Sequence, residues 1–525
     1  MKTFRLTGWL GLLALGAAVG CNSLDVTNPN APDAKRALSD PAALEAVAGG
    51  TLRTWFTGYE GMMAVGPLST IADAYSSSWN NFFMLYINSQ DPDGTRNSRP
   101  WKNEPGAQER AQLEWYWAKY YSAASSAADV LRAIRVDNVV INNAADTKRA
   151  ETMAAFVNGL AHSGIALNYD KGYVIDETVD VTKLEYVNRK EMRDAALAKL
   201  DQAIALANAN PFTTPAAWTN GRSYTNTQIA RIANTMAAMT LAYYPRNDTE
   251  NAAVDWARVA NYASKGMSGA SPFDFVFIGD GCSSWCHEVL IWFNAIDSGV
   301  IHTRVAHMLD PATQQDPYPV GGNPQPNSPD KRLGDGTFGD ESIVDGWGTI
   351  PEGPDTHPGT DFSFSYYEIF SANRGQYHQS NIGHIRYDLS RNQDPTGIWG
   401  GYGPAPVVSA GQNDLLWAEG LLRSGGDLAL AAAKINNTRV NRGGLSPALA
   451  SDGAAELMNK LHYEQEVELL GLGASPFYNR RRVANGLRTG TPAEMPVPAK
   501  ELGVRGEALY TFGGSGNPRN SPTPP

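Results

Sequence analysis

Small and apolar side chains recur every three to four residues through most of the segment from Ser39 to Met267. That spacing brings them to one face of an α-helix, and such a face must be buried against another element. The first helix has Ser39 or Asp40 as its N-cap and Pro41 at the first helical position. The sequence therefore predicts a mostly α-helical fold of amphipathic helices packed on one another.

Alanine and glycine occupy many inward positions of these helices, where they allow neighbouring helices to approach closely. Paired helices of this kind are typical of tetratricopeptide-like hairpins, although no strict repeat of about 34 residues is visible. We expect a tetratricopeptide-like region over residues 39–270. Its helices are expected near residues 39–56, 111–134, 150–167, 189–208, 227–244 and 255–267.

Residues 271–409 differ in character, because stretches such as "YPVGGNPQPNSPDKRLGDG" exclude long helices. Loops longer than about 15 residues are usually functional or disordered, and the many aromatic residues here argue against disorder. We expect a long, ordered, loop-rich insertion on the helical scaffold. Helices return over residues 410–512, and residues 513–525 form a flexible tail.

The N-terminus reads as a lipoprotein signal peptide over residues 1–20. Lys2 and Arg5 precede an apolar run from Leu6 to Val19, which is shorter than the ~20 residues of a membrane-spanning helix. Small or β-branched residues come directly before Cys21, as in a lipobox. Cys21 is therefore predicted to be the lipidated first residue of the mature protein, with residues 21–38 as a tether. Ordinary signal cleavage that leaves a free thiol is the alternative.

The amino-acid composition limits the classes of ligand that this chain can be expected to bind. The net charge of −11 argues against nucleic acid, since phosphate binding requires a basic face. The chain contains 13 Trp and 22 Tyr together with 51 Gly and 32 Pro, so large rings sit among long loops. Sugars stack on such rings, but aromatic residues also fill cores, and composition leaves both roles open.

Cys282 and Cys286 lie close together in "GCSSWCHE". In an exported protein this spacing favours a local disulfide. A metal site with His287 is the alternative, but zinc requires three or four ligands and no second cluster follows. We therefore expect a Cys282–Cys286 disulfide and no metal.

Glu464 and Glu468 are the strongest candidates for catalytic carboxylates, since they share one face of a helix. A glycosidase needs two carboxyl groups about 5 to 10 Å apart. Arginines 480 to 482 follow closely, however, and ion pairing with them would give the carboxylates a structural role. We favour the structural role.

Other chemical motifs are missing or weak. The sequence contains no Gly-x-Ser-x-Gly, His-Glu-x-x-His or phosphate-loop motif. Acidic, glycine-containing stretches at Asp91 and Asp335 suit calcium, but turn formation explains them better. We therefore expect no catalytic residues and no cofactor.

Two regions are candidates for ligand contact, although each ring in them can also be explained by packing. The first region, "YSSSWNNFFMLYIN", combines stacking surfaces with amides that bridge hydroxyl groups. The second is the insertion. The candidate residues are Trp79, Asn80, Asn81, Phe83 and Tyr86 in the first region, and Trp285, Trp347, Tyr366 and Trp399 in the second.

Several motifs resemble those of the SusD/RagB family and follow one another in the same order along the chain. "CNSLDVTNPN" resembles its mature start, "WYWAKYYSAASSAADVLRAI" its Trp-x-x-x-Tyr helix, and Arg149-Ala150 with Tyr169 to Gly172 the next helix. The C-terminal match is more specific. It consists of "NDLLWAEGLLRSGG", "INNTRVNRGGL", "LHYEQEVELLGLGASPFYNRRR" and "MPVPAKEL", in which Tyr478-Asn479 replaces the usual Asp-Leu.

The resemblance implies a SusD-like α-α superhelix anchored by lipid at the cell surface of an outer membrane. It implies a nutrient-binding protein, not an enzyme, that passes a glycan or another nutrient to a SusC-like TonB-dependent transporter. By position, the stretch from Trp79 to Tyr86 resembles the loop that contributes to the ligand site in the family. Two alternatives remain. One is a scaffold lipoprotein that binds another protein, and the other is a helical glycan-processing enzyme.

Overall fold

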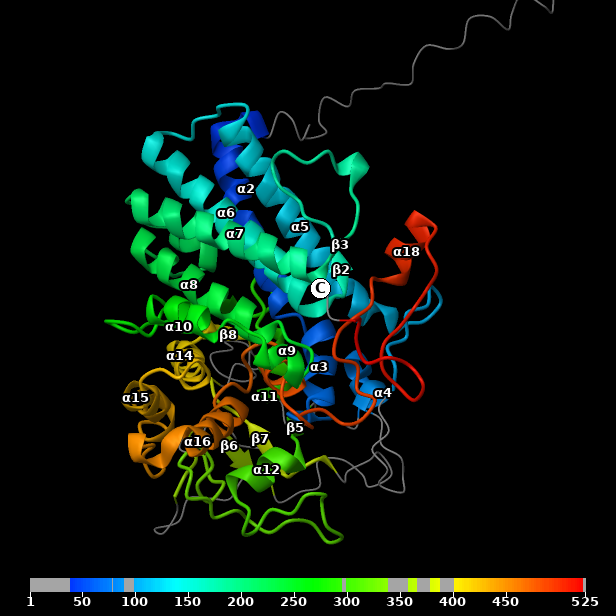
Figure 1. Cartoon of the computed structure of the whole chain (residues 1–525), viewed down its shortest axis with the longest axis vertical. Coiled ribbons are helices and arrows are strands. Elements are labelled where there is room, and N and C mark those ends of the chain that lie inside the picture. Colours follow the sequence, from blue (N-terminus) through cyan, green and yellow to red (C-terminus); the bar gives the residue numbers. More distant parts are fainter. Residues whose placement is uncertain are drawn as a thin grey trace, which may run out of the picture.

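The structure is a computed structural model that describes residues 38–77, 79–88, 99–294, 299–338, 357–365, 378–387 and 401–522. The predicted mostly α-helical fold is confirmed (Figure 1). Cys21, Asp91, Trp347, Tyr366 and Trp399 lie outside the described residues, so the expectations placed on them stay predictions.

Successive helices pack side by side through the N-terminal half, in the blue to green part of Figure 1. Helix α5 contacts α6, α6 contacts α7, and α7 contacts α8, while α2 covers α5 and α6. The helices are α2 (Pro41–Tyr59), α3 (Met62–Ile71), α4 (Met84–Asn88), α5 (Arg110–Arg135), α6 (Ala144–Asn168), α7 (Arg189–Ala209), α8 (Asn226–Tyr243), α9 (Asp248–Ala252) and α10 (Trp256–Ser264).

Local sequence explains where these helices begin and how closely they pack. Capping boxes, in which the N-cap side chain and the third helical residue exchange hydrogen bonds, start α7 at Asn188 and α8 at Thr225. A Cβ on Gly164 of α6 would overlap the ring of Tyr120 in α5. The small residue is therefore required for the close approach of the two helices.

The C-terminal helices continue the stack, since α14 packs against α10 at the lower left of Figure 1. They enclose a second, smaller apolar core around Leu415, Ile435 and Leu461. No helix among the described residues has both the length and the apolar character needed to cross a bilayer. The helices of this part are α14 (Ala410–Ser424), α15 (Leu428–Arg439), α16 (Gly453–Val467), α17 (Ser475–Arg481) and α18 (Ala499–Arg505).

Where the structure describes it, the segment between α10 and α14 contains short strands and the short helices α11 (Glu288–Asn294) and α12 (Thr303–Leu309). All of the strand pairs are antiparallel, and one of them joins this segment to the N-terminal half. The pairs are β1 (Tyr75–Ser76) with β5 (Val300–Ile301), β2 (Lys171–Gly172) with β3 (Val187–Asn188), β4 (Phe275–Asp280) with β8 (Tyr402–Val408), and β6 (Phe362–Phe364) with β7 (Ile382–His384).

A buried ionic network fastens this segment to α16. Arg332 has an exposed fraction of 0% and donates to Glu464 at 2.8 Å and to Glu468 at 3.1 Å. Arg386 binds Glu468 at 2.8 Å, and Arg442 binds the same carboxylate at 2.9 Å. Since both carboxylates are buried and paired, they do not face a sugar cleft.

The predicted partners of these two carboxylates were wrong, although their structural role fits. Arg480 pairs instead with Glu466 of α16 at 3.1 Å, and Arg482 pairs with Glu419 of α14 at 2.6 Å. The side chain of Arg481 donates to backbone carbonyls. Glu464 and Glu468 lie on a different side of α16 from Glu466. That side of the helix meets the loop-rich segment.

Candidate functional site

Residues 79–83 form a tight bend that leads directly into α4, which contains Tyr86. Phe82 and Phe83 have φ angles of 50° and 59°, in the left-handed region that bulky residues avoid. Such strain costs about 1–3 kcal/mol for each residue and is concentrated at functional sites. Gln112 of α5 donates to the Phe82 carbonyl at 2.7 Å and so helps to hold the bend.

Contacts of Tyr86 join this stretch to the loop before α5. The side-chain oxygen of Asn80 accepts from the Tyr86 amide at 3.0 Å, and the Tyr86 hydroxyl donates to the Pro100 carbonyl at 3.4 Å. The Lys102 ammonium lies 4.2 Å from the centre of the Tyr86 ring, and the Arg99 guanidinium lies 5.0 Å from it. Asn80 is exposed, and the four other candidates in this stretch are partly exposed.

A cavity of about 540 Å³ opens beside Tyr86. Its volume lies within the range of roughly 300–1,000 Å³ that is typical of small-molecule sites. The walls combine two aromatic residues with charged and hydrogen-bonding groups. The side chains that line it include Tyr86, Trp101, Lys102, Glu104, Gln108, Glu109 and Thr511.

The charged groups of this Tyr86 pocket are largely paired. The Lys102 ammonium donates to Glu109 at 2.6 Å, and this hydrogen bond raises the pKa of Lys102 and lowers the pKa of Glu109. Burial raises the pKa of Tyr86. At neutral pH the pocket therefore presents carboxylates, a neutral phenol and an ammonium already bound to a carboxylate.

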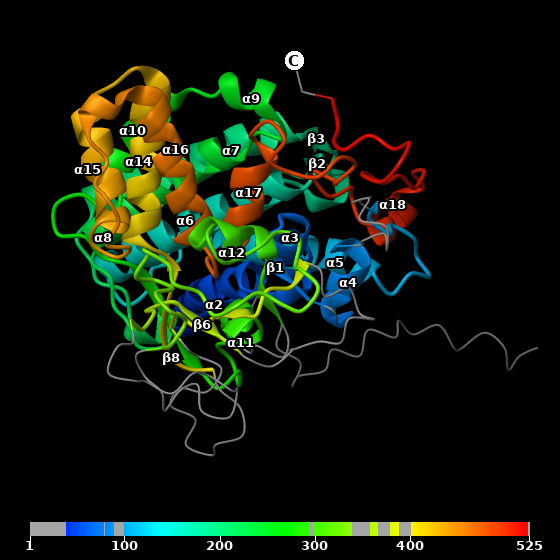
Figure 2. The same cartoon turned by 90° about the horizontal axis from the view of Figure 1, so that it is seen from below.

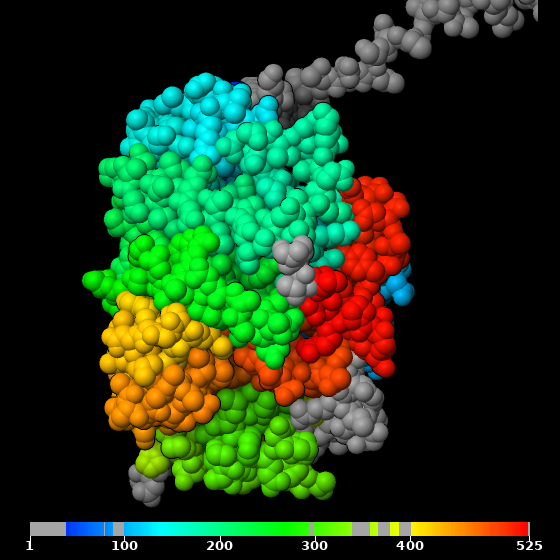
Figure 3. Space-filling model, in the orientation of Figure 1, coloured from blue at the N-terminus to red at the C-terminus, as the bar shows by residue number. Residues whose placement is uncertain are grey.

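Residues 493–512, here called the C-terminal arm, contribute Thr511 to the lining of the pocket. Residues 493–499 of the arm are buried, and its outer part belongs to the red surface in Figure 3. Asn103, in the loop before α5 that lines the pocket, fastens this loop to the arm. Its amide donates to the carbonyls of Val497 and Tyr510, each at 2.9 Å. Its oxygen accepts from the Ala499 amide at 2.7 Å. Figures 1 and 2 show the red segment beside α4 and α5.

Two further contacts join the arm directly to Trp101. The Thr511 hydroxyl donates to the Trp101 carbonyl at 2.6 Å, and the Trp101 indole donates to the Glu494 carbonyl at 2.9 Å. Trp101 is 2% exposed, so its ring supports the pocket more than it offers a stacking face.

The loop-rich segment reaches this region through a residue that was not among the candidates. Trp292 of α11 packs edge-on against Phe82, with ring centres 5.1 Å apart. Trp285, which was a candidate, instead packs in the core, with its ring centre 5.5 Å from Phe56 and 5.7 Å from Phe277. The expectation of ligand contact for Trp285 is therefore corrected, because its ring is buried.

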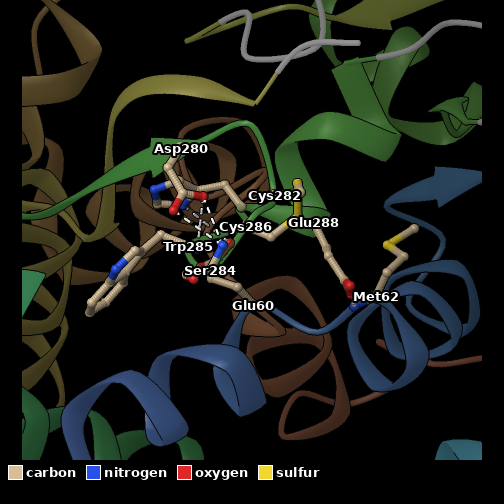
Figure 4. Close-up of a disulfide and its surroundings, with 9 residues drawn as sticks. Glu60, Met62, Asp280, Cys282, Ser284, Trp285, Cys286 and Glu288 are labelled. Carbon is tan, nitrogen blue, oxygen red and sulfur yellow. Dashed lines mark hydrogen bonds and ion pairs between the residues drawn. A yellow bond between two sulfur atoms is a disulfide. The ribbon is translucent and has the colours of Figure 1, made fainter. Parts of the chain in front are cut away.

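Cys282 and Cys286 are joined by a disulfide that closes the loop after β4 (Figure 4). Asp280 organises the same loop, since its carboxylate accepts from the amides of Ser284 and Trp285 at 3.0 and 2.9 Å. In Figure 4 the Trp285 ring points away from the sulfur atoms. The disulfide thus holds the turn between β4 and α11.

Metal ligation finds no support in the described part of the chain, where no three His, Cys, Asp or Glu residues are arranged to hold an ion. His287 faces the Phe277 carbonyl, with its Nε2 at 3.1 Å. Asp335 accepts from the amide of Thr337 at 2.9 Å and from its hydroxyl at 2.6 Å. These contacts stabilise a turn, as turn chemistry predicts.

Of the sequence candidates, Trp79, Asn80, Asn81 and Phe83 lie in or beside one bend, and Tyr86, in the helix α4 that follows, lines the pocket. The other pocket residues were missed. Lys102, Glu104 and Glu109 form no recognisable motif, and Thr511 lies at the opposite end of the sequence.

No protein-family model matches this chain, and no curated protein matches it. Solved structures do. A SusD-like protein from Bacteroides fragilis has a TM-score of 0.59 and 14% identity, covering 90% of this chain and 97% of that one. A SusD superfamily protein from Bacteroides vulgatus has a TM-score of 0.56 and 12% identity, covering 89% and 97%.

A third similar structure, described as a SusD-like carbohydrate binding protein from Bacteroides fragilis, has a TM-score of 0.54 and 11% identity, covering 85% of this chain and 86% of that one. The chain therefore has the SusD-like fold that its motifs predict. At these identities the likeness concerns the fold, so the ligand must be argued from the site.

Proposed function

We propose that this protein is a cell-surface lipoprotein that captures a glycan and delivers it to a SusC-like TonB-dependent transporter. The observation that carries the proposal is the Tyr86 pocket, a cavity of about 540 Å³ beside the strained bend at Phe82 and Phe83. Capture requires no bond-breaking chemistry, and the proposal assigns none.

The chemistry of the pocket suits a sugar. Tyr86 supplies an aromatic edge, Gln108 an amide, and Glu104 and Thr511 oxygen atoms that accept hydrogen bonds from hydroxyl groups. Ligand sites of this kind combine apolar surface with a few fixed polar groups. One structural neighbour is described as carbohydrate binding, which supports the same class of ligand for this fold.

Surface anchoring rests on the signal peptide and Cys21. Several acyl chains on an N-terminal cysteine hold a soluble domain firmly on a membrane, since each buried CH₂ contributes roughly 0.8 kcal/mol. The transporter partner rests on the SusD/RagB resemblance of the motifs. An exported, tethered binding protein needs such a partner to move its ligand across the outer membrane.

The ligand is tested by affinity electrophoresis of the full chain in gels that contain single polysaccharides. Tyr86→Ala is expected to weaken retardation at least tenfold. Phe212→Ala, which removes a partly exposed ring outside the pocket, is the matched control and should leave retardation unchanged. Equal losses in both variants would contradict the pocket assignment.

The transporter is tested by purifying the tagged, lipidated protein from detergent-solubilised outer membranes, with Cys21→Ala as the control. We expect a stoichiometric β-barrel protein that is reduced in the control. A membrane-bound protein that brings down another soluble protein, and no barrel, would replace this proposal with the scaffold alternative. Release of shortened glycan from a bound polysaccharide would favour the enzyme alternative.

A further inference from the structure

The charged side chains that line the Tyr86 pocket indicate whether its ligand is charged or neutral. Among the side chains that line it, Lys102 supplies one ammonium, and Glu104 and Glu109 supply two carboxylates. The ammonium is already hydrogen-bonded to Glu109 at 2.6 Å. A carboxylated or sulfated sugar would have to break this pair and face both carboxylates at short range.

The N-terminus of α5 points to the same conclusion. The amide groups at the start of a long helix attract anions, and α5 begins at Arg110 beside the pocket. Glu109 is the N-cap residue of this helix, and although its side chain makes no capping hydrogen bond, its carboxylate places a negative charge next to the helix start. This charge opposes the binding of an anionic ligand at the end of the helix that would otherwise attract it.

Charges around the pocket do not reverse this balance. Arg99 lies over the Tyr86 ring at 5.0 Å but is not among the residues that line the cavity. It offsets at most one of the two carboxylates. The net charge of −11 over the whole chain adds a repulsive field for anions.

The lining is rich in groups that accept hydrogen bonds. The carboxylates of Glu104 and Glu109, the Gln108 side-chain oxygen and the Thr511 hydroxyl all accept, while the Thr511 proton is already donated to the Trp101 carbonyl. A neutral glycan offers many hydroxyl donors, and hydrogen bonds from hydroxyl groups to carboxylates are among the strong ones.

We infer that the Tyr86 pocket binds an uncharged glycan and rejects glycans that carry carboxylate or sulfate groups. The inference rests on the proposed function and adds a selectivity that the fold does not imply. Lys102 and Glu109 are the residues that set this selectivity. They act as an internal ion pair that satisfies the one ammonium among the described residues of the lining.

The test is affinity electrophoresis of the full chain on two sets of polysaccharides. The neutral set is dextran, laminarin, xylan and galactan, and the acidic set is polygalacturonate, alginate, hyaluronate and heparin. We expect retardation by at least one neutral polymer, loss of that retardation in Tyr86→Ala, and no retardation by any acidic polymer.

Two variants sharpen the result. Lys102→Met removes the ammonium and leaves the Glu109 carboxylate unpaired, so acidic polymers should stay unretarded, as with the wild type. Glu109→Gln should leave the Lys102 ammonium without its ion-pair partner and should raise retardation by acidic polymers about tenfold. The Glu109 side chain is partly exposed and makes no capping hydrogen bond, and Gln keeps its size, so the variant is expected to fold.

The outcomes separate the inference from the proposed function. Stronger binding of an acidic than of any neutral polymer, or a gain of acidic-polymer binding in Lys102→Met, would overturn the inference and leave glycan capture standing. Failure of both sets to bind the folded protein would overturn the proposed function and the inference together. Circular dichroism of each variant establishes that it is folded.

Discussion

Replacement of Asp170 by Asn should stabilise this protein at neutral and alkaline pH. Asp170 follows α6, and both oxygens of its carboxylate lie 2.8 Å from the Tyr510 hydroxyl of the C-terminal arm. Burial and, after it, the nearby Glu494 carboxylate raise the pKa of this carboxyl to about 7. Lys171 and the Tyr510 hydrogen bond act in the opposite direction but do not offset these causes.

The sign of this stability change follows from the difference between the pKa of Asp170 in the folded state and in the unfolded state. An ordinary aspartate has a pKa of 3.8, so the unfolded chain ionises before the folded one. Ionisation therefore costs the folded state stability as pH rises from about 4 to about 7, and the loss is constant above that range. The full difference corresponds to ~4 kcal/mol. Partial exposure of Asp170 reduces the expected effect to about 2 kcal/mol.

The assay is chemical denaturation with urea at pH 4 and pH 8, followed by circular dichroism. Asp170→Asn keeps an oxygen that accepts from Tyr510 but cannot ionise, so it should exceed the wild type by about 2 kcal/mol at pH 8 and match it near pH 4. Asp137→Asn, at an exposed position, is the control and should show no such difference. A wild type that gains stability from pH 4 to pH 7 relative to Asp170→Asn would refute the reasoning.

Three more substitutions test how the fold is held together. Arg332→Met leaves buried carboxylates without their partner and should cost about 3–5 kcal/mol in urea denaturation; a loss below about 1 kcal/mol would contradict the network. Asn103→Ala should free the C-terminal arm, so hydrogen exchange at Thr511 should rise while exchange in α6 stays unchanged. Joint replacement of Cys282 and Cys286 by Ser opens a loop with a sequence separation of 4, and a loss of about 2 kcal/mol is expected from loop closure; an unchanged urea midpoint would argue against that estimate.

Periodicity and caps made the helices predictable, because these signals are local. The spacing of inward residues places α7 and α8 within a few residues of their observed bounds, and Gly164 permits the packing that small residues suggested. The SusD-like fold was predictable from motif order for the same reason. Each motif is a short stretch whose local structure accompanies it along the chain.

The partners of buried charges were not predictable, because they depend on which loops meet in space. Nearby arginines such as Arg480 seemed natural partners for Glu464, yet Arg332 reaches it from the loop-rich segment. Trp285 illustrates the same difficulty for aromatic residues, since a tryptophan in a loop can pack in the core as readily as it faces a ligand. Sequence spacing carries no signal for either outcome.

The bend at Phe82 and Phe83 keeps its shape through contacts with other parts of the fold. Two consecutive bulky residues in the left-handed region cost energy that the bend alone does not recover. The Gln112 side chain of α5 and the contact with Trp292 of α11 impose the shape from other parts of the fold. The side chains around Tyr86 are therefore fixed before a ligand arrives. A ligand then binds without the cost of ordering this bend, which favours capture of a weakly held, hydroxyl-rich chain.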